Sequence, residues 1–133
     1  MAHELYRGAL VAGVVPRSLE LPGGIVGRQR IVRLSRRQLQ HIAARRPDWL
    51  LFCLLHMADV IARPEYVGYR PRAHVRRVEF ARTVGRQNRL LLIAVKFLDE
   101  TAEAWVSTAH PLSAADLTRR LRANTMQPVL RGP

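Results

Sequence analysis

The pattern of apolar residues in the second half of this 133-residue chain constrains its fold most strongly. From residue 75 onward the pattern has a period of two, which is typical of strands with one covered face. It defines three stretches, 75–84, 89–98 and 103–110, joined by the short links 85–88 and 99–102. Short links of this kind join antiparallel neighbours as hairpins. The sequence therefore predicts three consecutive antiparallel strands.

Two helices are expected before these strands. Ser35 with Gln38 three residues later forms a capping box, which predicts a helix that ends at about Arg46, before a proline. A second helix, Pro47–Ile61, starts with proline in its first turn. It is apolar on most sides, so we expect it to be largely buried.

The remaining segments complete the predicted architecture. Residues 31–34 suggest a brief strand, and residues 64–73, rich in Gly and Pro, a loop. Ser113 and Asp116 resemble another capping box and predict a short helix to about Leu121. We therefore expect an α+β fold, with N-terminal helices packed on one face of a small antiparallel sheet of three to four strands and a short C-terminal helix. The expected domain limits are a loosely ordered lead-in or linker over 1–29 that could contain a short strand, one domain over 30–122 and a tail over 123–133.

The charge of the chain favours an anionic partner. It has 22 basic residues against 10 acidic ones, a formal net charge of +12. Such a field attracts nucleic acid, acidic membrane surfaces or an acidic protein. Lys96 is the single lysine and lies inside the apolar run 90–98. A charge in such a run is costly unless its side chain reaches a surface or a partner.

Several classes of site are disfavoured. Cys53 is the one cysteine, so neither an internal disulfide nor a thiol zinc cluster is available, and its apolar neighbours predict a buried thiol. The histidines lack metal-ligand spacing, so we expect no metal and no cofactor. No segment has the roughly eighteen apolar residues of a membrane span, and the N-terminus lacks the pattern of a secretory signal.

Strand parity predicts which side chains share a face of the sheet. Closing both hairpins pairs Val84 with Arg89 and Leu98 with Glu103, and counting back gives rows of neighbours. The rows of the apolar face, which should carry the helices, are Phe80, Ile93 and Thr108; Val78, Val95 and Val106; and Arg76, Phe97 and Ala104. The rows of the opposite face are Arg77, Lys96 and Trp105; and Glu79, Ala94 and Ser107.

This polar face has two interpretations. It could handle phosphates, with Trp105 stacking on a base and the cations holding the phosphate. It could equally be an ordinary solvated face with salt bridges such as Glu79–Arg77 or Glu79–Lys96. A single bulge would move part of a strand to the other face. The arginines of the last helix, Arg119, Arg120 and Arg122, are expected on its exposed side.

Three segments together resemble a known group of nucleases. Residues 39–47 read LQHIAARRP, 92–97 read LIAVKF and 103–111 read EAWVSTAHP. Their order and spacing resemble phage and polymorphic-toxin nucleases of the barnase–EndoU–colicin–RelE group, over about residues 30–121. The resemblance implies a metal-independent ribonuclease or a derivative of one. It nominates as catalytic residues His41, Arg45, Lys96 and Thr108.

Two positions depart from the pattern of that group, and one pair conflicts with parity. Arg46 stands where the group often has a second histidine, and His110 where it often has tyrosine. If that second histidine is essential, the chain is impaired or relies on His110 instead. Parity does not readily bring Lys96 and Thr108 to one face, so they converge at a strand end or a bulge intervenes.

The nominated residues could cleave RNA without a metal. Such cleavage needs a base for the 2′-OH, an acid for the leaving 5′-oxygen and cations for the phosphorane. His41 or His110 could serve as base or acid, and Arg45 and Lys96 could stabilise the phosphorane. Ser107 or Thr108 could donate a hydrogen bond to the phosphate, with Glu79 as reserve base. The residues expected to bind RNA are Arg46, Arg77, Glu79, Trp105 and Ser107.

The sequence thus predicts a metal-independent endoribonuclease, the toxin domain of a larger secreted, phage or toxin–antitoxin protein. It would act in the cytoplasm, and its antagonist would be an acidic immunity protein or antitoxin. Two alternatives stay open. One is a nucleic-acid-binding module of the same fold without catalysis, and the other is an arginine-rich module that docks an acidic partner protein.

Overall fold

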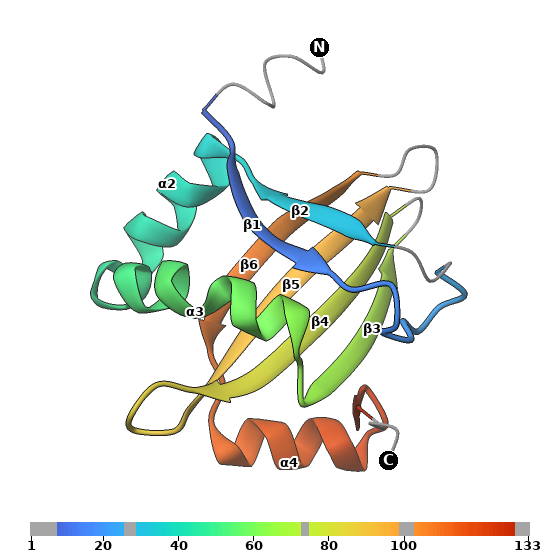
Figure 1. Ribbon diagram of the computed structural model, residues 1–133. Coiled ribbons are helices and arrows are strands. Elements are labelled where there is room, and N and C mark those ends of the chain that lie inside the picture. The colour runs from blue at the N-terminus through green and yellow to red at the C-terminus, as the bar shows by residue number, and fades with distance from the viewer. Residues whose placement is uncertain (1–7, 26–28, 73–74, 99–102, 130–133) are drawn as a thin grey trace.

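The computed structural model describes residues 8–25, 29–72, 75–98 and 103–129 (Figure 1). Within these ranges seven strands form one mixed sheet in the order β1-β2-β6-β5-β4-β3-β7. The strands are β1 (Leu10–Val15), β2 (Arg30–Leu34), β3 (Tyr66–Arg72), β4 (Val75–Val84), β5 (Arg89–Leu98), β6 (Ala104–Pro111) and β7 (Met126–Pro128). The helices are α2 (Arg36–Arg45), α3 (Leu50–Ala62) and α4 (Ala114–Arg122), with the 3₁₀ turn η1 (Pro47–Trp49) before α3.

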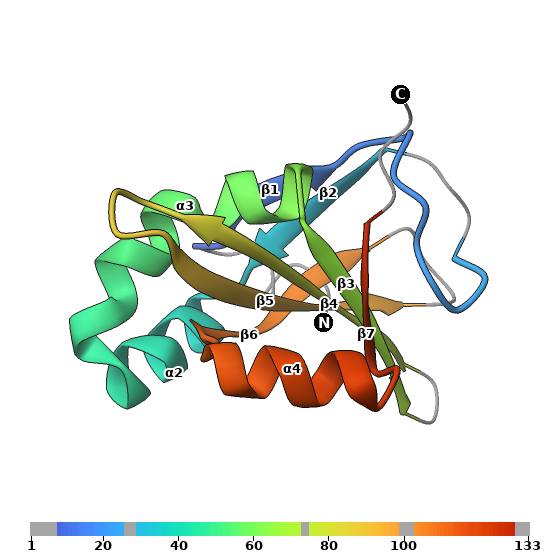
Figure 2. The same cartoon turned by 90° about the horizontal axis from the view of Figure 1, so that it is seen from below.

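The helices cover both faces of the sheet. Figure 2 shows α3 on one side of the strands and α4 on the other. Below, these sides are called the α3 face and the α4 face. The main core lies on the α3 face, where Cys53, Met57 and Ile61 of α3 belong to the same buried cluster as Phe80 and Ile93 of the sheet. A smaller cluster on the α4 face joins Leu117 of α4 to five buried residues: Ala81, Leu92, Ala94, Leu112 and Met126.

The prediction of a small sheet with helices on one face is therefore wrong. The fold is α+β, but its sheet is mixed and has seven strands, and α4 covers the face opposite to α3. Strands β3 and β7 were not expected, whereas β1 is the short strand considered for the lead-in. β1 pairs antiparallel with β2, β7 pairs antiparallel with β3, and β3 occupies the predicted loop 64–73. The sheet consequently extends beyond the expected domain limits of 30 and 122.

The predicted helices and hairpin strands are confirmed almost to the residue. The Ser35 side chain accepts a hydrogen bond of 3.1 Å from the Gln38 backbone N–H at the start of α2. Ser113 caps α4 in the same way, through the Asp116 N–H at 3.1 Å. These caps satisfy donors that the first helical turn cannot bond internally. β4 and β5 span the predicted ranges 75–84 and 89–98 and pair throughout.

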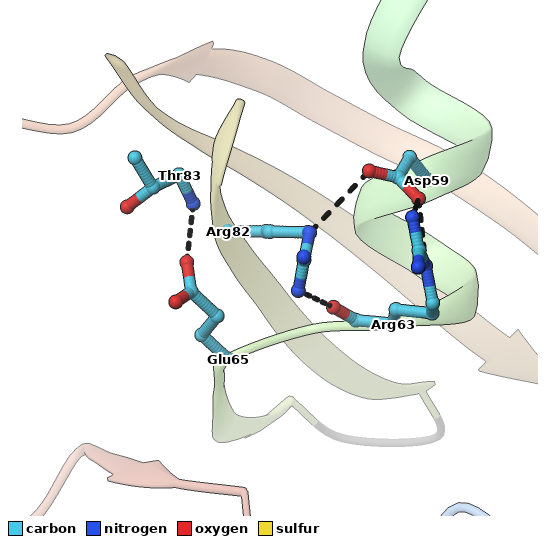
Figure 3. A network of polar contacts seen from close by, with 5 residues as sticks. All are labelled: Asp59, Arg63, Glu65, Arg82 and Thr83. Carbon is cyan, nitrogen blue, oxygen red and sulfur yellow. Dashed lines mark hydrogen bonds and ion pairs between the residues drawn. The ribbon is translucent and has the colours of Figure 1, made fainter. Parts of the chain in front are cut away.

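A polar network ties the C-terminal end of α3 to the sheet (Figure 3). Arg63 donates to Asp59 Oδ1 through Nε at 2.9 Å and Nη2 at 2.6 Å. Arg82 of β4 lies 3.3 Å from Asp59 Oδ2 and donates to the Arg63 carbonyl at 2.7 Å. The Arg63 hydrogen bond, with the charges of both arginines, lowers the pKa of Asp59 below its ordinary value. In the same region the Thr83 N–H donates to Glu65 Oε1 at 2.6 Å.

Candidate nucleic-acid interface and active site

Five neighbouring strands contribute basic or aromatic side chains to one row of the α4 face. The register pairs Arg70 of β3 with Arg77 of β4, and Arg77 with Lys96 of β5. Lys96 pairs in turn with Trp105 of β6, and Trp105 with Arg33 of β2. Paired residues point to the same side of a sheet. We call these five residues the cation row; parity predicted its three central members, and the register confirms them.

A β-bulge in β6 decides which residues of this strand lie on the same face as the cation row. Val95 pairs with Val106, but Ala94 pairs with Thr108, so Ser107 is an extra residue without a partner in β5. From that point β6 is shifted by one residue, and Thr108 moves to the side of Ala94 and Lys96. The bulge therefore resolves the conflict between Lys96 and Thr108.

Two predicted rows are corrected by the same bulge. Ile93 of the apolar face has Ala109 as its neighbour rather than Thr108. Ala94 of the polar face has Thr108 as its neighbour rather than Ser107. The rows through Val95 and Phe97 lie before the bulge and are as predicted.

The members of the cation row differ in exposure. Lys96 is exposed and, among the described residues, has no ion-pair partner, whereas Arg77 and Arg33 are half-buried and make further contacts. Trp105 is only 5% exposed. The sequence suggested that a base could stack on its indole, but a ring this deeply buried offers no open surface for stacking. The row thus offers exposed charge at its centre, with Trp105 as a buried neighbour.

Glu79 organises the arginines next to this row. Its side chain is 2% exposed, and its Oε1 accepts from Arg120 Nη1 of α4 at 2.6 Å. Arg70 Nε lies 3.3 Å from the same oxygen. A buried carboxylate that holds two guanidinium groups is poorly placed to act as a reserve base. Sequence reasoning missed both partners, because Arg70 fell in a predicted loop and Arg120 on the presumed exposed side of the last helix.

His110 lies on the α4 face two residues beyond Thr108, as the neighbour of Leu92. It is partly buried, and its Nδ1 is 2.9 Å from the Pro111 carbonyl oxygen. A carbonyl can only accept, so Nδ1 bears the proton in this contact and Nε2 of the neutral ring is left with a lone pair. This tautomer suits a general base that acts through Nε2.

The helix that bears His41, α2, is attached to the bulged strand. Helix α2 lies beside β6, and the Gln38 side-chain amide donates a hydrogen bond to the carbonyl of Ser107, the bulged residue. Ile42 and partly buried Leu39 point into the α3-side core. By helical periodicity His41 and Arg45 then lie on the flank turned away from that core. Both are exposed, as is Arg46, the residue that caps the helix.

The described residues contain no group of three or more His, Cys, Asp or Glu side chains that could hold a metal ion. In the same part of the chain, none of the helices is both long and apolar enough to cross a membrane. A cavity of about 880 Å³ lies elsewhere, between residues 18–22 and strands β3 and β7, and none of the candidate residues lines it.

Comparison with known proteins leaves the site to be interpreted from its geometry. The chain matches no protein-family model, no curated protein and no solved structure.

Proposed function

We propose that this protein is a metal-independent endoribonuclease whose site spans the α4 face of β5 and β6 and the adjoining flank of α2. The observation on which this proposal rests is the bulge at Ser107. It aligns Thr108 with Lys96 on one face, and the carbonyl of the bulged residue anchors Gln38 of the helix that bears His41. These two features support a site that combines residues from distant parts of the sequence.

Each residue has a role in a transesterification. Nε2 of His110 removes the proton of the 2′-OH, and the 2′-oxygen attacks the phosphorus. The bond from phosphorus to the 5′-oxygen breaks, and the protonated ring of His41 donates a proton to that oxygen. Lys96 and Arg45 stabilise the negative charge of the phosphorane, and Thr108 donates a hydrogen bond to one of its oxygens. The products are a 2′,3′-cyclic phosphate and a free 5′-OH.

The proposal also includes the biological setting. A basic ribonuclease of net charge +12 requires protection of the RNA in the cell that makes it, and an acidic immunity protein or antitoxin would complement its field. The resemblance to phage and polymorphic-toxin nucleases supports a toxin domain that acts on cytoplasmic RNA after delivery as part of a larger protein.

The test is the rate of cleavage of a labelled RNA by purified protein in EDTA. The variants are His41→Ala, His110→Ala and Lys96→Gln. We expect each histidine variant to lose about 10²–10⁴-fold in rate, the usual contribution of an acid–base group. Arg86→Gln, a charge removal in the exposed 85–88 turn, is the matched control and should stay within about two-fold of wild type, as expected for a solvated surface charge. RNA that stays intact with wild-type protein would refute the proposal.

One departure from the nuclease pattern favours a second candidate function, RNA binding without cleavage. Arg46 occupies the position of the second histidine, and an arginine cannot exchange a proton near neutral pH. In this case the same assay would show no scission, while filter binding of the same RNA would show an affinity that falls steeply with salt.

A further inference from the structure

We infer that the cation row is a track for single-stranded RNA, which lies across the strands rather than along them. This inference rests on the proposed function for its ligand, RNA, but not on cleavage. The relevant observation is continuous register: Arg33, Trp105, Lys96, Arg77 and Arg70 are neighbours in one row over five strands.

The row has the dimensions of a polymer site rather than of a single phosphate site. Neighbouring strands lie about 4.8 Å apart, so the four gaps from Arg33 to Arg70 span about 19 Å. Four cations on a line of this length can contact successive phosphates of one strand. A compact anion such as inorganic phosphate would reach only one or two of them.

The electrostatics of the row point to an anionic ligand. Like charges directly opposite one another on neighbouring strands destabilise a sheet, and this row contains the consecutive cations Arg70, Arg77 and Lys96. Two carboxylates flank it. Glu79 is engaged by Arg120 and Arg70, and Glu103 precedes β6. Lys96, exposed at the centre of the row, is the cation whose charge a polyanion laid along the row would neutralise.

The neighbouring helix favours a single strand over a duplex. Helix α4 covers the next part of the same face, where Leu117 packs with Leu92 and Met126. The cations therefore form a narrow strip that is bounded on one side by α4, the helix that Figure 2 shows on this side of the sheet. A flexible single strand can follow such a strip, whereas a rigid duplex needs a broad surface that presents contacts to two backbones.

The test measures binding separately from cleavage. The probe is a fluorescein-labelled 2′-O-methyl oligouridylate, which lacks the attacking hydroxyl, and its anisotropy gives Kd from 50 to 200 mM salt. Single-stranded sites lose about 0.7 in the slope of log K against log salt for each phosphate contact removed. Lys96→Gln and Arg33→Gln should each lower the slope by about that amount, and Arg86→Gln should not change it.

Two further comparisons test the direction of the track and the form of the RNA. Lys96, at the centre, should matter for short and long probes alike, whereas Arg33, at one end, should matter more for long probes. A 2′-O-methyl duplex of equal length should bind more weakly than the single strand. The inference is overturned if the row variants weaken binding no more than Arg86→Gln does, or if the duplex binds more tightly. If the binding results are as expected but the protein does not cleave RNA, the proposed function is refuted and the inference of an RNA-binding track is still supported.

Discussion

The buried carboxylate of Glu79 gives the sharpest structural prediction, tested by Glu79→Gln. The substitution keeps the shape of the side chain but removes the charge that holds Arg120 at 2.6 Å and Arg70 at 3.3 Å. Arg120 is 18% exposed and would lose its counter-charge, while Arg70 is 49% exposed and can turn to water. Loss of one partner of a buried ion pair costs about 3–5 kcal/mol.

The half-exposed Arg70 places the expected loss at the lower end, about 3 kcal/mol. With an unfolding entropy of about 2.1 cal/mol/K per residue, the 133-residue chain should melt about 10 °C lower. The assay is urea unfolding followed by tryptophan fluorescence, with thermal melts as a second measure. Asp116→Asn is the matched control, because its pair with Arg119 is exposed, at 40% and 75%, and should contribute less than about 1 kcal/mol.

A loss below about 1 kcal/mol for Glu79→Gln would contradict this account of the α4 face. It would mean that α4 does not depend on this ion pair for its position.

Three other predictions concern stability and reactivity. Arg63 lowers the pKa of Asp59, so the contribution of this ion pair to stability should be present at neutral pH and lost as pH falls below about 4. Asp59→Asn should therefore cost about 0.5 kcal/mol at pH 7 in urea unfolding, because the pair is largely exposed. A stability difference between wild type and variant that widens in acid would contradict this prediction. In Gly68→Ala the new methyl group would collide with the Thr125 backbone carbonyl, so we expect a loss of about 1–3 kcal/mol in the same assay, and an unchanged midpoint would refute the tight β3–β7 contact. Burial raises the pKa of Cys53, so iodoacetamide at pH 8 should label the folded protein far more slowly than the urea-unfolded one; equal rates would show that the thiol is accessible.

Sequence alone predicted the elements that local chemistry specifies. The Ser35 and Ser113 caps mark the starts of α2 and α4, and both form as hydrogen bonds. The β4–β5 hairpin was predictable because Gly85 and Asn88 suit positive φ, the backbone conformation that they adopt here at 79° and 50°.

Strand β3 was missed because it contains a glycine and a proline, which are typical of turns. Both residues are explained by how β3 packs and pairs with other segments. Gly68 lies where the Thr125 carbonyl approaches closely. Pro71 lies beyond the part of β3 that pairs with β7, which covers only Tyr66–Gly68. Proline is tolerated there because the open side of the strand needs no backbone donor. The same two residues in isolation indicate a loop.

The sequence nominated candidate residues, but it could not give the geometry that relates them. Parity counting identified the central cations of the row, because alternation holds until the first irregularity. The bulge at Ser107 has no local signature, and its effect is to place Thr108, rather than Ser107, beside Ala94 on the α4 face. Arg33 and Arg70 joined the row only through the pairing of strands that are distant in sequence.

The most direct test of the central claim is the chemistry of the RNA ends after incubation with wild-type protein in EDTA. We predict fragments that bear a 2′,3′-cyclic phosphate and a 5′-OH, identified by mass spectrometry. We also predict no cleavage at a position whose 2′-OH is replaced by hydrogen. Uncleaved RNA, or fragments with 5′-phosphate ends, would contradict the assignment of His41, His110, Lys96 and Thr108 to one site for 2′-OH attack.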